Sequence, residues 1–180
     1  RLGGRAGGVG AALVLALLPG VFLRRSTAGF SDHQVAEVLL QATAVLAVMV
    51  ALRSAEREKP VFELLLDRDW AALREPTKWA ALAGIAIGLY MWVWPPAVVL
   101  VGILGVFFTI ALVVEYQAGR SPDHLAYIGV VIGVVSAVIV LLSIDQFTLG
   151  VTSLSPLQVG ISLGLAVGSA FIAYLARILD

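Results

Sequence analysis

The sequence of 180 residues contains no cysteine and few charged residues. Without cysteine the chain can form no disulfide bond, no thiolate metal site and no cysteine nucleophile. Charged residues make up 13% of the chain, well below the share of about 25% that is typical of soluble domains. Twelve Lys and Arg are balanced by twelve Asp and Glu, so there is no basic field to attract nucleic acid. We therefore expect no nucleic-acid partner.

The common signatures of enzymes are missing as well. The sequence has no G-x-S-x-G elbow, no phosphate-binding loop and no pair of carboxylates within an apolar segment. The two histidines, His33 and His124, fall on opposite sides of the membrane in the topology derived below. They cannot share a b-type haem, and no third ligand completes a zinc site. We expect a protein that is not an enzyme and that has no catalytic residue, no cofactor and no metal.

Apolar residues are abundant, at 60% of the chain. They gather in six segments long enough, or nearly so, to cross the roughly 30 Å of bilayer hydrocarbon. The sequence predicts an all-α fold, a polytopic transmembrane helix bundle of five or six spans. Residues 1–180 would form a single integral membrane domain, with spans at about 7–23, 35–52, 79–94, 96–114, 125–144 and 157–176.

Two of these segments allow an alternative interpretation. The first could be a signal peptide, but Arg24 and Arg25 follow it directly, and positive charge there disfavours cleavage, so a retained span is the better interpretation. The third is short and ends at Trp94-Pro95-Pro96, where neither proline can donate a backbone hydrogen bond. We expect segments three and four to form a tight hairpin; the alternative is a re-entrant pair.

The loops carry an uneven share of the cations, which predicts the orientation. Ten of the twelve Lys and Arg lie in the N-terminus, the 53–78 loop, the 115–124 loop and the C-terminus. The positive-inside rule places both termini in the cytoplasm of a bacterial or archaeal cell, with the chain in its inner membrane. Residues 60–75 show helical apolar spacing, which predicts an amphipathic helix. It would lie on the cytoplasmic membrane surface, or dock on this protein or a partner.

Glycines recur at a spacing of four, which places them on one face of a helix. Such faces let two helix backbones approach closely in lipid, where helix association has no hydrophobic driving force. The expected seams lie within the chain or against another subunit. The residues are Gly84 and Gly88, Gly129 and Gly133, and the series Gly160, Gly164 and Gly168.

The charged stretch between the first two spans is the candidate functional site. Arg24 and Arg25 could form an outward collar for anions, with His33 and Glu37 as a pH-sensitive pair at helical spacing. The same residues could dock an extracytoplasmic partner. In a third interpretation the arginines pair with nearby carboxylates and anchor at lipid headgroups.

From about residue 5 to residue 156 the layout resembles the small membrane subunit of tripartite tricarboxylate transporters. The resemblance rests on the outer loop STAGF, on the broken hairpin GLYMWVWPP, and on the outer segment IDQFTLGVTSLSP. It implies packed helices beside a larger permease subunit, in contact with membrane lipid, and an extracytoplasmic solute-binding protein that delivers substrate.

The expected function is therefore that of a small, non-catalytic membrane subunit of a carboxylate importer, which supports the larger permease. Two alternatives remain open. The chain could be a structural or assembly subunit of a respiratory, photosynthetic or secretion complex. It could also form a homo-oligomeric channel or small transporter, with the last glycine series as its seam.

Overall fold

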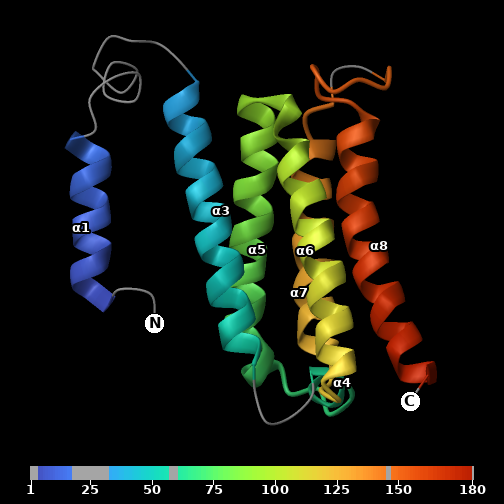
Figure 1. Ribbon diagram of the computed structural model, residues 1–180. Coiled ribbons are helices and arrows are strands. Elements are labelled where there is room, and N and C mark those ends of the chain that lie inside the picture. Colours follow the sequence, from blue (N-terminus) through green and yellow to red (C-terminus); the bar gives the residue numbers. More distant parts are fainter. Residues whose placement is uncertain (1–3, 18–32, 57–60, 145–146, 180) are drawn as a thin grey trace.

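The computed structural model describes residues 4–17, 33–56, 61–144 and 147–179, and every regular element in these ranges is helical (Figure 1). This confirms the predicted all-α class. The elements are α1 (Gly4–Leu17), α3 (Gln34–Ala55), α4 (Val61–Leu66), α5 (Trp70–Val93), the 3₁₀ turn η1 (Pro95–Ala97), α6 (Val98–Gln117), α7 (Asp123–Leu141) and α8 (Pro156–Leu179).

Five long helices form an up-and-down bundle. Helix α7 packs against both α5 and α8, while α3 covers α5 and α6 covers α8. Helix α1 stands apart from this bundle in Figure 1. The connections alternate between two ends of the bundle. We call the end where α3 begins the His33 end, and the end where α4 lies the α4 end.

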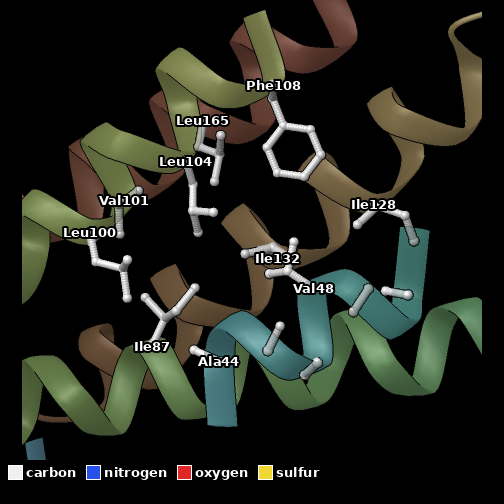
Figure 2. Packing of buried hydrophobic residues seen from close by; sticks show 14 of the residues in the cluster. Ala44, Val48, Ile87, Leu100, Val101, Leu104, Phe108, Ile128, Ile132 and Leu165 are labelled. Carbon is white, nitrogen blue, oxygen red and sulfur yellow. The ribbon is translucent and has the colours of Figure 1, made fainter. Parts of the chain in front are cut away.

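The core has small side chains between α3 and α5 and larger side chains among the other helices. Alanines at Ala44, Ala47 and Ala51 form the buried face of α3, and they meet the alanine face of α5. Small residues allow close backbone contact in lipid, where packing has to supply the association energy. Larger side chains fill the space between α5, α6, α7 and α8, as Figure 2 shows for Ile87, Leu100, Val101, Leu104, Phe108, Ile128, Ile132 and Leu165.

Four helices are long and apolar enough to cross a bilayer: Gln34–Ala55, Pro95–Gln117, Asp123–Leu141 and Pro156–Ile178. The chain is therefore a helical membrane domain. Helix α5 is not among the four, although it is 24 residues long. Its first turns carry Arg74, Glu75 and Lys78, charged residues that lower its hydropathy.

The turn after α5 lies where the proline pair was predicted to end a span. Trp94 adopts an extended conformation with φ −147°, and η1 then leads directly into α6. After this turn α6 packs mainly against α8 instead of α5. Segments three and four are thus consecutive helices whose main partners lie elsewhere in the bundle.

The single surface helix predicted over residues 60–75 is wrong in extent. Helix α4 has only six residues, and the chain then breaks at Arg68, whose φ is 56°. Asp69 caps the next helix, because its carboxylate accepts a hydrogen bond of 3.1 Å from the backbone N–H of Ala72. Helix α5 then continues through Pro76 to Val93. Pro76, which directly follows the predicted range 60–75, therefore lies within α5 and does not follow the end of a helix.

Candidate functional site

At the His33 end, the two ionisable residues predicted at the start of α3 form a pair. His33 occupies the N-cap position of α3, and its Nε2 lies 2.9 Å from Oε1 of Glu37. The imidazole is more than half exposed, whereas the carboxylate is largely buried. The two side chains therefore face each other across the first turn of α3.

The other two residues of the predicted site, Arg24 and Arg25, lie outside the described residues. The structure therefore does not place them relative to His33 and Glu37. Gln41, one turn further along α3 than Glu37, is exposed.

At the α4 end, a second charged cluster was not predicted from the sequence. Arg177, near the end of α8, donates two hydrogen bonds to the carboxylate of Asp123, the first residue of α7, at 2.7 and 3.2 Å. The Asp123 side chain is 10% exposed and that of Arg177 is 36% exposed. A planar guanidinium fork that faces a carboxylate fixes both distance and orientation. The pair therefore fastens α7 to α8.

The same guanidinium holds the short helix α4. Its Cζ lies 3.6 Å from the centre of the Phe62 ring, a cation–π contact. Phe62, Asp123 and Arg177 line both of two open grooves, of about 400 and 520 Å³. Arg120 lies on the first of these grooves and donates two hydrogen bonds, of 2.6 and 2.9 Å, to Glu115. The hydrogen bond to Glu115 and the charge of Glu115 raise the pKa of Arg120.

The predicted glycines divide into two groups. An added Cβ at Gly84 would lie 2.7 Å from Val135, and one at Gly88 would lie 2.5 Å from Ile139. At Gly133 it would lie 2.6 Å from the backbone oxygen of Ser162, and at Gly129 it would collide with the Ser169 hydroxyl. These four glycines let α7 approach α5 and α8. At Gly160, Gly164 and Gly168 an added Cβ meets no atom within 4 Å.

The arrangement within the described residues gives two polar clusters, one at each end of an apolar bundle. No group of three His, Asp or Glu residues in those ranges could hold a metal ion. Asp123 and Arg177 are separated by 54 positions. Their pairing depends on the packing of α7 and α8, and local spacing carries no signal for it.

In sequence and in fold, the chain matches part of known oligosaccharyltransferases. The chain is 49% identical, over 177 residues, to the dolichyl-monophosphooligosaccharide–protein glycotransferase AglB of Haloferax volcanii; this covers 98% of this chain and 17% of that protein. It is also similar to the Archaeoglobus fulgidus oligosaccharyltransferase AglB, whose structure was solved in complex with an inhibitory peptide and a dolichol-phosphate. The identity is 28% and the TM-score is 0.77, and the match covers 93% of this chain and 18% of that chain. A second structure of the A. fulgidus enzyme, tethered to an acceptor peptide containing the NVT sequon, matches with the same identity and TM-score. That match covers 93% of this chain and 19% of the A. fulgidus chain. The chain thus spans less than a fifth of the length of these relatives.

These findings correct several expectations. The resemblance to a tripartite tricarboxylate transporter subunit was wrong, and so were the import function, the permease and the solute-binding partner that it implied. The expectation that the protein is not an enzyme was also wrong, because the relatives are glycotransferases, which are enzymes. Apolar helices joined by charged loops are imposed by the bilayer on unrelated proteins, so this layout could not identify a family. Residues 1–178 match the family described as oligosaccharyl transferase STT3, N-terminal, and the chain belongs to that family.

Proposed function

We propose that the chain is part of the membrane domain of an enzyme that transfers an oligosaccharide from a dolichyl phosphate carrier to protein. The identity of 49% over 177 residues to H. volcanii AglB carries this proposal. The acceptor in the A. fulgidus complex is a peptide with an NVT sequon, in which asparagine receives the glycan. This chain contains no asparagine, so the acceptor side chain has to come from another protein or another segment.

In this proposal the bundle supplies the scaffold on which both substrates meet. The His33 end would face the outside of the cell and the α4 end the cytoplasm, as the distribution of Lys and Arg indicates. Helix α5 would be a further span, since it packs between α3 and α7 along the bundle. Helix α1 would cross next to α3, and the membrane domain would then have six spans.

The charged stretch at the His33 end would act on the lipid carrier. A dolichyl phosphate group is anionic, and guanidinium groups recognise phosphate through charge-assisted hydrogen bonds. We propose that Arg24 and Arg25 attract this phosphate toward the His33 end. His33 and Glu37, which are paired at 2.9 Å, follow these arginines in the sequence.

The test of the proposed function is a chimaera of H. volcanii AglB in which residues 1–178 of this chain replace the matching segment. We expect the chimaera to restore glycosylation of a reporter protein in cells that lack AglB, because the two segments share half of their residues. A chimaera with the A. fulgidus segment, which is 28% identical to this chain, is the matched comparison. A chimaera of this chain that reaches the membrane at normal amounts and is thermally stable, yet transfers no glycan, would refute the proposal.

A second experiment tests the arginines alone. Replacing Arg24 and Arg25 with glutamine should raise the KM for the lipid-linked oligosaccharide at low ionic strength and have a smaller effect at high ionic strength. Salt screens exposed charges beyond a Debye length of about 10 Å at 0.1 M. Glycan transfer to a sequon peptide, measured at two salt concentrations, provides this comparison. Equal kinetics for the variant and the parent protein at both concentrations would show that the arginines do not steer the carrier.

A further inference from the structure

The loop of residues 147–155, between α7 and α8 at the His33 end, exposes apolar side chains. Phe147 is 87% exposed and Leu149 is 77% exposed, and Val151 is exposed as well. The loop contains no charged residue. Leu141 and Leu142 at the end of α7 are exposed as well, and Asp145 and Gln146 lie between them and the loop in the sequence. Such side chains in water would leave a large apolar surface uncovered.

The backbone of this loop is bonded from within by two buried side chains. The Gln158 amide donates hydrogen bonds to the backbone oxygens of Gly150 (3.1 Å) and Ser153 (3.0 Å). Its Oε1 accepts a bond of 3.0 Å from the backbone N–H of Ser155. The Ser155 hydroxyl accepts from the backbone N–H groups of Gly150 and Leu157, both at 3.3 Å. Ser155 and Gln158 are fully buried.

Bonding of this kind is what a non-helical backbone needs in lipid. In water a loop can leave its carbonyl and N–H groups to the solvent, whereas in hydrocarbon each unbonded group costs several kcal/mol. The backbone groups of Gly150, Ser153 and Ser155 are bonded from within, while Phe147, Leu149 and Val151 point outward beside the exposed Thr148 and Thr152. Large exposed apolar side chains over an internally bonded backbone fit contact with lipid better than contact with water.

The depth of the loop agrees with lipid contact. Helix α7 has 19 residues, or about 28 Å at 1.5 Å per residue, so its end lies near the edge of the hydrocarbon layer. Trp92 and Trp94 lie at the same end of the bundle and are partly exposed, as is typical of aromatic residues at a membrane interface. We propose that the 147–155 loop is embedded in the outer leaflet, with Phe147 and Leu149 in contact with lipid acyl chains.

The test uses spin labels on the protein reconstituted into phosphatidylcholine vesicles. The 180 residues contain no cysteine, so Phe147→Cys and Leu149→Cys each introduce a single thiol into this chain. Both side chains point outward, so labelling should not disturb the packing. Accessibility to oxygen, which concentrates in lipid, is then compared with accessibility to a water-soluble nickel chelate. Ile103→Cys on the exposed face of α6 is the lipid control, and Glu75→Cys near the α4 end is the water control.

We expect labels at positions 147 and 149 to show an oxygen-to-nickel ratio several-fold above that of position 75 and approaching that of position 103. A ratio equal to that of position 75 would show a loop in water and overturn the proposal. Low accessibility to both reagents would show that protein covers the loop, and this would overturn it equally. Neither result depends on glycan transfer, so the proposal stands or falls independently of the proposed function.

Discussion

Replacing Gly133 with leucine is expected to lower the stability of the bundle more than any other single substitution considered for this chain. A Cβ at this position would lie 2.6 Å from the Ser162 oxygen and 2.7 Å from the Ala166 nitrogen, both of which are backbone atoms of α8. Backbone cannot move aside as a flexible side chain can, so α7 and α8 would have to separate. Overpacking typically lowers the free energy of unfolding by about 1–3 kcal/mol. For Gly133→Leu we expect a loss at or above the upper end of this range. Thermal unfolding in detergent, followed by tryptophan fluorescence, measures the change.

Gly160→Leu is the matched control for this substitution. Gly160 lies on α8, four residues before Gly164, just as Gly133 lies four residues after Gly129. An added Cβ at Gly160 nevertheless meets no atom within 4 Å. We expect its melting temperature to stay close to that of the parent protein. Equal losses of stability for Gly133→Leu and Gly160→Leu would show that the close approach of α7 and α8 does not limit stability.

Replacing Asp123 with asparagine is expected to loosen the α4 end. The substitution keeps the size of the side chain but removes the charge that faces Arg177 at 2.7 Å. Removing one partner of a buried pair leaves the other charge uncompensated, at a cost of about 3–5 kcal/mol. Arg177 is 36% exposed and can recover some hydration, so we expect a smaller loss, about 1–3 kcal/mol. Chemical unfolding of the purified protein measures this loss.

A double-mutant cycle with Arg177→Gln separates the pair from other effects of either substitution, such as the interaction of Asp123 with the start of α7. The comparison pair is Glu75 and Lys78, which lie at a similar distance of 2.8 Å but are both 53% exposed. Glu75→Gln should leave the stability close to that of the parent protein, because exposed pairs contribute little. A coupling energy near zero between Asp123 and Arg177 would mean that the packing of α7 and α8, and not the ion pair, holds this end together.

The helices could be predicted from the sequence because hydrocarbon selects apolar segments of a fixed length. The predicted second span, 35–52, lies within α3, and the last predicted span, 157–176, lies within α8. The break at Arg68 could not be predicted in the same way. A left-handed backbone at an arginine has no strong sequence signal, and Pro76 pointed to a helix end where α5 continues. Local preferences are weak beside the packing of a long helix.

The candidate site could be predicted only where its residues are neighbours in sequence. His33 and Glu37 are one helical turn apart, so their pairing follows from the helix itself. Glycine spacing identified faces suited to close packing but not which faces have a partner. Gly129 and Gly133 meet α8, whereas Gly160 and Gly164 face open space, although the spacing is the same. Which face has a partner is decided by the arrangement of the helices in the bundle.

The contact between Asp123 and Arg177 also sets an order of assembly during synthesis. Arg177 follows Asp123 by 54 residues, so at about 5–20 residues per second the ribosome makes it roughly 3–11 s later. Until then Asp123 has to remain hydrated at the membrane surface, because its partner does not yet exist. Arg177 also supplies the ring contact to Phe62. Helix α4 is therefore translated early but receives this contact only after the last helix of the bundle has been made.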